Sequence, residues 1–102
     1  ILVCCIALTP ETRGIVSKEI FDGLSADAIF INIARGALAD EAALTAWLQN
    51  GGSAVLDVFE EEPLPENSPL WDMESVILTP HNSFIGEGNH ARLWRKIKEG
   101  LG

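Results

Sequence analysis

Four short apolar runs, separated by stretches with helical spacing, constrain the fold of this chain more than any other feature. The runs are residues 1–8, 28–33, 54–58 and 75–79. Nearly continuous apolar strands are typical of parallel sheets that are covered on both faces. Because the strands alternate with helical patterns, the sequence predicts an α/β fold with a parallel sheet.

The stretches between these runs carry signals for helix ends. Ser17 can cap a short first helix, and Asp40 can cap a second helix that ends at Gly51. A last helix is predicted to begin near Asn89, with its apolar residues at helical spacing. Residues 59–72 form a long polar loop instead. A loop of this length in a compact domain is usually functional.

Charge and hydropathy exclude several function classes. The formal net charge is −8, and an acidic chain is a poor ligand for nucleic acid, which requires clustered basic residues. Four of the seven basic residues lie between positions 92 and 98, which indicates the solvated face of the last helix. No apolar run is long enough to span a membrane. We therefore expect neither nucleic acid nor membrane as a partner.

Cys4 and Cys5 are the only cysteines. Neighbouring residues on a strand point to opposite faces, so these two thiols cannot readily bridge to each other. No other metal ligand lies close to them in sequence. We interpret them as buried, reduced thiols of a cytosolic protein.

Polar and charged residues follow three of the predicted strands, where ligands bind in open parallel sheets. Arg35 follows the second strand, Asp57 lies at the end of the third and is followed by residues 60–62, and His81 follows the fourth. Each also has a structural interpretation. Arg35 can be a surface cation, and Glu60 and Glu61 can be solvated loop charges. Asp57 can be a hydrogen-bonded buried acid, and His81 can fix a turn. Together they indicate a site at one edge of the sheet.

Such a set of side chains is suited to the reduction of a carbonyl group. A guanidinium binds a carboxylate through two parallel hydrogen bonds. Histidine, with an unperturbed pKa of ~6.5, can give a proton to a developing alkoxide. A glutamate bonded to that histidine stabilises the imidazolium. The hydride must come from a cofactor, because no side chain supplies one.

Four motifs resemble those of the D-isomer-specific 2-hydroxyacid dehydrogenases, in order and along nearly the whole chain. The matching segments are residues 8–14, 31–36, 56–64 and 78–81. The resemblance implies a Rossmann-like parallel sheet with flanking helices, equivalent to the second half of a dinucleotide-binding domain. Residues 1–102 would then be a partial NAD(P)-binding domain. The sequence contains no G-x-G-x-x-G phosphate loop and no substrate-binding domain.

The resemblance also implies a role for each matching residue. Arg35 would bind the substrate's carboxylate and carbonyl oxygen. Glu62, five residues after Asp57, stands at the position of the family's catalytic glutamate, and His81 would donate the proton in reduction. Asp57 would hold the nicotinamide carboxamide, and Ser83 would lie near the nicotinamide. Further cofactor-lining positions would be Ile6, Ala7, Thr12, Ile33, Ala34 and Arg35 itself.

The implied activity is hydride transfer between NAD or NADP and a small 2-oxo acid or D-2-hydroxy acid, in a cytoplasmic homodimer. The chain begins inside a predicted strand without an initiator Met, which suggests a piece of a longer protein. We expect the 102 residues alone to be catalytically silent, because they lack the glycine loop and helix N-terminus that bind the pyrophosphate.

Three alternatives remain open from the sequence. The first is a non-catalytic dinucleotide sensor or corepressor on the same fold, against which the presence of Arg35, Glu62 and His81 argues. The second is a small interaction module whose exposed apolar faces seek a partner. The third is a formate dehydrogenase, against which Glu62 argues, because that branch places Gln at this position.

Overall fold

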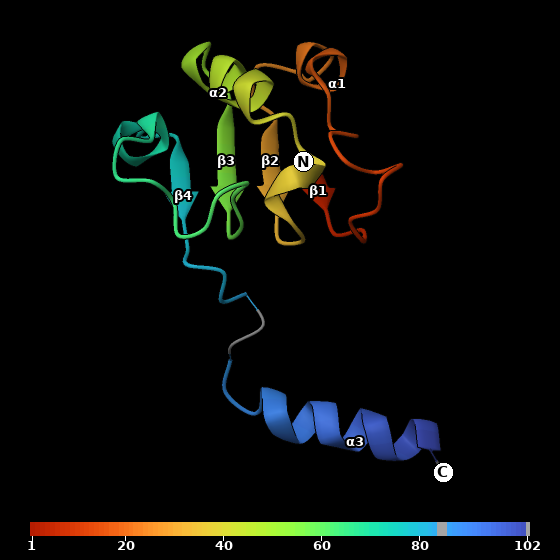
Figure 1. The fold of residues 1–102 in the computed structure, drawn as a ribbon. Helices are drawn as coiled ribbons and strands as arrows, with labels where there is room; N and C mark the ends of the chain where they lie inside the picture. The colour runs from red at the N-terminus through yellow and green to blue at the C-terminus, as the bar shows by residue number, and fades with distance from the viewer. Residues whose placement is uncertain (84–85, 102) are drawn as a thin grey trace.

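A computed structural model describes residues 1–83 and 86–101 of the chain. Its centre is a four-stranded sheet in which all neighbouring strands are parallel and follow the order β1-β2-β3-β4. The strands are β1 (Leu2–Cys4), β2 (Ile29–Asn32), β3 (Ser53–Leu56) and β4 (Val76–Leu78). Their arrows point the same way in Figure 1, so the carboxyl ends form one edge. The predicted parallel α/β fold is confirmed.

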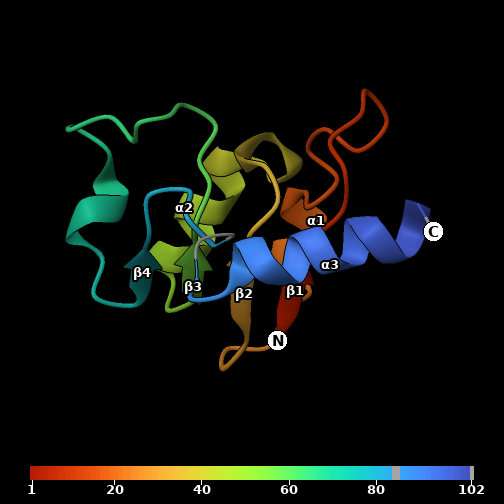
Figure 2. The same ribbon diagram turned by 90° about the horizontal axis from the view of Figure 1, so that it is seen from below.

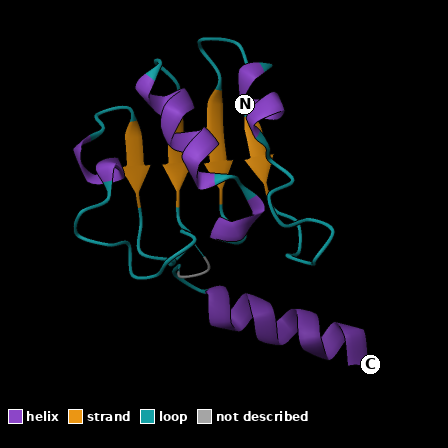
Figure 3. Cartoon of the chain, turned by 45° about the horizontal axis from the view of Figure 1, so that its top comes forward, coloured by secondary structure: helices purple, strands orange, loops and turns teal. Residues whose placement is uncertain are grey.

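Two helices, α1 (Lys18–Asp22) and α2 (Glu41–Gln49), lie on one face of the sheet (Figure 3). The Phe21 ring of α1 meets the Phe30 ring of β2 edge-on at 5.3 Å, and Trp47 of α2 lies 5.5 Å from Phe21. Leu44 and Leu48, one turn apart on α2, are buried in the same core. This single hydrophobic layer between helices and sheet holds the strand ends in place.

The opposite face of the sheet is largely open to solvent in this chain. Val3 and Ile77 expose 47% and 61% of their surface, and Ile29 is also exposed. The expectation that the strands are buried on both faces is therefore wrong for these residues. The reason is geometric, because α1 and α2 cover one face and no helix among the described residues packs on the other.

The first strand is also shorter than the apolar run that predicted it. Residues 1–8 were expected to form one strand, but β1 spans only Leu2–Cys4. Cys4 is buried, whereas Cys5 is exposed, so the expectation of two buried thiols is wrong for Cys5. Cys5 lies beyond the end of β1 and outside the buried core cluster that contains Cys4.

Local signals at the helix ends have mixed outcomes. The Asp40 side chain accepts a hydrogen bond from the Ala43 N–H and caps α2, as predicted, and Gly51 follows the helix with a φ of 102°. Ser17 occupies the N-cap position of α1 but makes no side-chain capping hydrogen bond. The predicted loop 59–72 ends in a short 3-10 helix, η2 (Pro69–Asp72), and is anchored to the core by Leu64 and Leu70, which are both buried.

The last helix, α3 (Asn89–Leu101), begins where the sequence predicted and lies apart from the sheet in Figure 1. None of its residues is buried, and its apolar side chains are exposed together with its basic ones. Its apolar residues are Leu93, Trp94, Ile97 and Leu101. Within residues 1–83 and 86–101, no helix combines the length and the apolar character needed to cross a bilayer.

Candidate active site

The segments that leave the carboxyl ends of the strands meet at one edge of the sheet, seen from below in Figure 2. They carry the side chains that the sequence singled out. Residues 5–7 follow β1, residues 33–36 follow β2, residues 57–62 follow β3 and residues 79–83 follow β4. The segment between β1 and α1 is hydrogen-bonded to the 3-10 turn after β2, η1 (Gly36–Leu38). The donors are the N–H groups of Gly14 and Val16.

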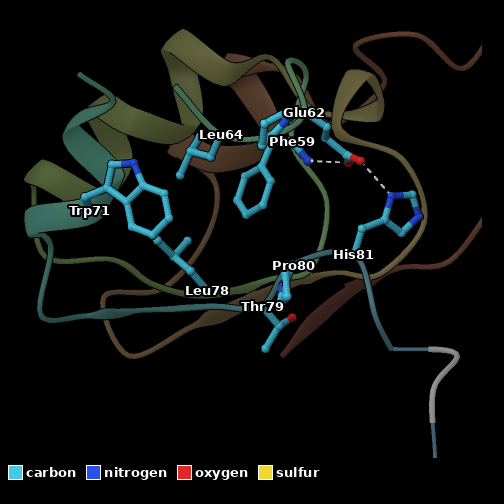
Figure 4. Close-up of a pocket in the computed structure, with 9 residues that line it drawn as sticks. Phe59, Glu62, Leu64, Trp71, Leu78, Thr79, Pro80 and His81 are labelled. Carbon is cyan, nitrogen blue, oxygen red and sulfur yellow. Dashed lines mark hydrogen bonds and ion pairs between the residues drawn. The ribbon is translucent and has the colours of Figure 1, made fainter. Parts of the chain in front are cut away.

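His81 and Glu62 form a direct contact at this edge. Nδ1 of His81 lies 2.7 Å from Oε2 of Glu62, and the dashed line in Figure 4 marks this pair. The other Glu62 oxygen, Oε1, accepts a hydrogen bond from the Phe59 N–H at 3.1 Å. Because a carboxylate only accepts, Nδ1 of His81 carries the shared proton. That leaves Nε2 as the imidazole atom available to a ligand, and no residue in the described part of the chain bonds to it.

Hydrogen bonds set the charge state of Glu62. Burial acts to raise the pKa of its carboxyl group, but the bonds from His81 and the Phe59 N–H outweigh it. The charges of His81 and Arg35 act in the same direction, so the pKa of Glu62 is lowered. Glu62 is therefore ionised at neutral pH and acts as the acceptor beside the imidazole.

Arg35 lies on the turn after β2, and Asn32 shapes that turn. The Asn32 side chain is buried; its Nδ2 donates to the Arg35 carbonyl at 3.0 Å and its Oδ1 accepts from the Ala34 N–H at 3.1 Å. The guanidinium of Arg35 is exposed and donates to the Ala34 carbonyl at 2.7 Å. It acts on Glu62 through space. The structure thus pairs Glu62 with His81 directly and places Arg35 within electrostatic range of Glu62.

Gly36 allows the Arg35 turn to approach the loop that carries Glu62. A Cβ atom built on Gly36 would lie 1.9 Å from the carbonyl carbon of Phe59 and 2.3 Å from the Glu60 nitrogen. Only a residue without a side chain fits this approach of two backbones. The close contact brings the loop after β3 beside the turn after β2.

Asp57 directly follows β3 and is only 1% exposed. Its Oδ1 accepts hydrogen bonds from the Thr79 hydroxyl at 2.5 Å and the Asn82 N–H at 2.8 Å, and its Oδ2 accepts from the Ser83 N–H at 2.9 Å. Burial acts to raise the pKa of this carboxyl group, but these hydrogen bonds lower it to about 2. Asp57 is thus a buried, ionised carboxylate that holds the segment after β4.

The predicted cofactor-lining residues present an open surface along the same edge. Ile6, Ala7, Ile33 and Ser83 are exposed, although two of them are large and apolar. Ala34 and Thr12 are half-buried. Exposed apolar side chains of this kind are chemically suited to the face of a nicotinamide ring and its ribose.

Thr12 has a structural task in the loop that carries part of this surface. Its hydroxyl donates to the Ala7 carbonyl at 2.8 Å and accepts from the Thr9 N–H at 2.7 Å. These bonds fold residues 7–12 back on themselves. The Thr9 hydroxyl also lies 3.2 Å from the Thr12 hydroxyl, so a contact from Thr12 to a cofactor would have to share this hydroxyl with partners inside the chain.

A cavity of about 600 Å³ adjoins the His81–Glu62 pair on the side of the 59–72 loop. Figure 4 shows that its walls are mostly apolar. The lining residues are Phe59, Glu62, Pro63, Leu64, Trp71, Leu78, Thr79, Pro80 and His81. The Trp71 indole N–H is already bonded to the Pro65 carbonyl at 2.9 Å.

Sequence reasoning assigned no role to Asn32 or Thr79, although both shape the site. An Asn at the end of a buried strand often bonds to the backbone of a following turn, so Asn32 carried a readable signal. Thr79 carried none, because its partner Asp57 lies 22 residues away in sequence. Within residues 1–83 and 86–101, no group of three His, Cys, Asp or Glu residues is arranged to hold a metal ion.

Taken together, the parallel sheet and its flanking helices are of the Rossmann-like type that forms NAD-binding domains. Residues 1–83 match the family profile described as D-isomer specific 2-hydroxyacid dehydrogenase, NAD binding domain. The chain belongs to this family. The resemblance expected from the four motifs is confirmed.

Individual relatives agree with this membership. A glyoxylate/hydroxypyruvate reductase B from Salmonella gallinarum (strain 287/91 / NCTC 13346) is 50% identical over 91 residues, which is 86% of this chain and 27% of the relative. The chain therefore spans about a quarter of the length of the curated relatives it matches.

Solved structures show the same fold. A D-isomer specific 2-hydroxyacid dehydrogenase from Xanthobacter autotrophicus Py2, in complex with NADPH and MES, has a TM-score of 0.78 and 46% identity. The match covers 96% of this chain and 43% of that one. An NADPH-dependent glyoxylate/hydroxypyruvate reductase from Sinorhizobium meliloti, in complex with NADP and sulfate, has a TM-score of 0.79 and 36% identity, over 98% and 33% of the two chains.

Proposed function

We propose that this chain supplies the nicotinamide side of the active site of an NAD(P)-dependent D-2-hydroxyacid dehydrogenase. The observation that carries the proposal is the 2.7 Å contact between His81 and Glu62 at the carboxyl edge of the sheet. A histidine oriented by a carboxylate is a general acid and base in the pH range of cells. The reaction is the reduction of a small 2-oxo acid, or its reverse.

His81 moves the proton in this reaction. In reduction, Nε2 of the imidazolium donates to the carbonyl oxygen as that oxygen gains charge, and the product is a 2-hydroxy acid. Glu62 holds Nδ1 and balances the positive charge before the transfer. In oxidation, neutral His81 accepts the hydroxyl proton at the same atom. When bound, the nicotinamide cofactor supplies or accepts the hydride at C2 of the substrate.

Arg35 binds the substrate in this proposal. Its guanidinium is exposed at the turn after β2 and acts electrostatically on Glu62. A planar guanidinium can take both oxygens of the substrate's carboxylate and so orient C2 toward the hydride donor. The positive charge also stabilises the alkoxide that forms during reduction.

The cofactor would lie along the strand ends with its nicotinamide near His81. Ile6, Ala7, Ile33 and Ala34 would line the ring and ribose, Thr12 and Arg35 would border them, and Ser83 would lie at the carboxamide, with the buried Asp57 behind it. The two solved relatives were crystallised with NADPH or NADP. The proposed cofactor is accordingly NAD or NADP.

We further propose that residues 1–102 are part of a dinucleotide-binding domain within a longer protein. The support is that the curated relatives are almost four times as long as the matched segment. The complete enzyme would be a cytoplasmic homodimer that also contains a phosphate-binding loop and a substrate-binding domain, as the family resemblance implies.

A chimaera tests the proposed function. The matching segment of the Xanthobacter autotrophicus enzyme would be replaced by this chain. The structural match between the two includes 96% of the residues of this chain. NADPH consumption would then be measured with glyoxylate, hydroxypyruvate and pyruvate. Turnover with any of these 2-oxo acids is the expected result. A chimaera that binds NADPH and reduces none of them would instead favour a non-catalytic sensor.

A further inference from the structure

His81 has an unusual backbone conformation for a residue with a side chain. Its φ is 53°, in the left-handed region that Cβ atoms disfavour. A non-glycine residue stays in this region only where the surrounding structure fixes it there. The segment after β4 must therefore contain interactions that hold His81 in this conformation.

The carboxylate of Asp57 supplies those interactions on both sides of His81. It accepts from the Thr79 hydroxyl, two residues before the histidine, at 2.5 Å. It also accepts from the N–H groups of Asn82 and Ser83, which follow the histidine, at 2.8 Å and 2.9 Å. The His81 N–H itself turns back to the Thr79 carbonyl at 3.1 Å. One buried carboxylate thus closes the turn on which His81 sits.

The same strand end also holds the partner of His81. The Phe59 N–H, two residues beyond Asp57, donates to Oε1 of Glu62 at 3.1 Å. Asp57 therefore fixes the histidine and Phe59 fixes the glutamate, so both members of the pair are held by hydrogen bonds to residues 57–59. This shared attachment explains how groups that are 19 residues apart in sequence meet at 2.7 Å.

We propose that Asp57 is a positioning residue for His81 and that the Thr79 hydroxyl is its essential donor. This inference rests on the proposed function, in which His81 transfers the proton. Together, Asp57 and Thr79 hold the left-handed turn and aim Nδ1 at Glu62, which leaves Nε2 facing the substrate. At least three of the roughly four acceptor positions of the carboxylate are used within the chain, and the side chain is 1% exposed.

The first test is spectroscopic and uses the 102-residue chain. Thr79→Val removes the hydroxyl donor and nearly keeps the shape, whereas Thr79→Ser keeps the donor. The ring nitrogens of His81 would be followed by ¹⁵N NMR, with His90→Gln to assign the two histidines and Glu62→Gln as the reference for a lost ion pair. We expect the His81 signals of Thr79→Val to move toward those of Glu62→Gln, and those of Thr79→Ser to stay near wild type.

Unchanged His81 signals in a folded Thr79→Val chain would overturn the proposal. If that variant does not fold, Asp57→Asn decides in the same way. The NH2 group of the asparagine would replace one carboxylate oxygen and would face a donor, either the Ser83 N–H or the Thr79 and Asn82 donors. Two donors cannot bond to each other, so the turn would open. A folded Asp57→Asn chain with wild-type His81 signals would equally refute the positioning role.

The second test separates positioning from cofactor contact and uses the chimaera. With Thr79→Val, we expect kcat to fall by about 10- to 100-fold, the scale of a misplaced catalytic group, with KM for NADPH unchanged. Thr79→Ser should restore kcat. A raised KM for NADPH at constant kcat would mean that this cluster serves the cofactor only. If the unmodified chimaera shows no turnover, the proposed function fails, while the NMR result still decides the role of Asp57 and Thr79.

Discussion

Oε2 of Glu62 and Nδ1 of His81 lie 2.7 Å apart, although one belongs to the loop after β3 and the other to the segment after β4. The contact engages Nδ1 and leaves Nε2 as the nitrogen that would transfer the proton in the proposed reaction. Glu62 is ionised because its hydrogen bonds lower the pKa of its carboxyl group and outweigh its partial desolvation. In the proposed function, Arg35 binds the substrate and the nicotinamide ring lies beside this pair.

Glu62→Gln should lower kcat of the chimaera by at least ~10-fold, because an amide cannot balance the positive charge of the imidazolium. Glu61→Gln is the matched control, since Glu61 is the neighbouring exposed carboxylate and does not contact His81 within the described residues. Steady-state kinetics with glyoxylate measures both variants. Equal losses in the two would show that general loop charge, and not the contact with His81, matters.

Arg35→Lys should raise KM for the 2-oxo acid and lower kcat, because an ammonium cannot reproduce the two parallel hydrogen bonds of a guanidinium. Arg13→Lys is the control, since Arg13 is exposed and its ion-pair distance to Glu60 is long, at 3.9 Å. Initial rates over a range of substrate concentrations separate the two constants. Wild-type kinetics in Arg35→Lys would remove Arg35 from substrate binding.

Gly36→Ala should destabilise the chain by about 1–3 kcal/mol, the usual scale for forcing atoms into a packed site. The added Cβ would collide with the Phe59 backbone, which is rigid and cannot swing away. Gly23→Ala is the control, because its Cβ would meet its nearest neighbour at an ordinary 3.4 Å. Urea unfolding of the 102-residue chain provides both free energies. A Gly36→Ala chain as stable as wild type would contradict the close approach.

The lowered pKa of Asp57 predicts that the free energy of unfolding decreases at acidic pH. The folded state lowers its pKa from 3.8 to about 2, so its contribution is fully present above pH 3.8 and is lost as the pH falls toward 2. The shift corresponds to about 2 kcal/mol of unfolding free energy. The stability difference between wild type and Asp57→Asn should therefore shrink across this window. A difference that stays constant from pH 5 to pH 2 would contradict the assignment.

Much of the fold could be predicted because its signals are local. Asp40 stands immediately before a periodic helix and caps it, and each apolar run contains a strand of the parallel sheet. Which strand face is covered could not be predicted. Val3 and Ile77 are as apolar as buried residues, and their exposure depends on which elements pack against the sheet. Cys5 was misjudged because the strand ends one residue before it.

The site could be predicted less completely from the sequence alone. The sequence showed that Arg35, Asp57, Glu62 and His81 follow strand ends, and the family resemblance supplied their roles. The contacts that organise them join positions 19 to 26 residues apart, such as Thr79 with Asp57 and Glu62 with His81. No local pattern reports such pairs, and the left-handed turn at His81 follows only from the three-dimensional arrangement.

The most direct test of the central claim is the turnover of the chimaera that carries His81→Gln, compared with the same chimaera that carries His90→Gln. Glutamine can hydrogen-bond to a carbonyl oxygen but cannot transfer a proton to it. We predict that NADPH-dependent reduction of glyoxylate or hydroxypyruvate falls by roughly 100-fold or more in His81→Gln and is unchanged in His90→Gln. An unchanged rate in a folded His81→Gln chimaera would contradict the account.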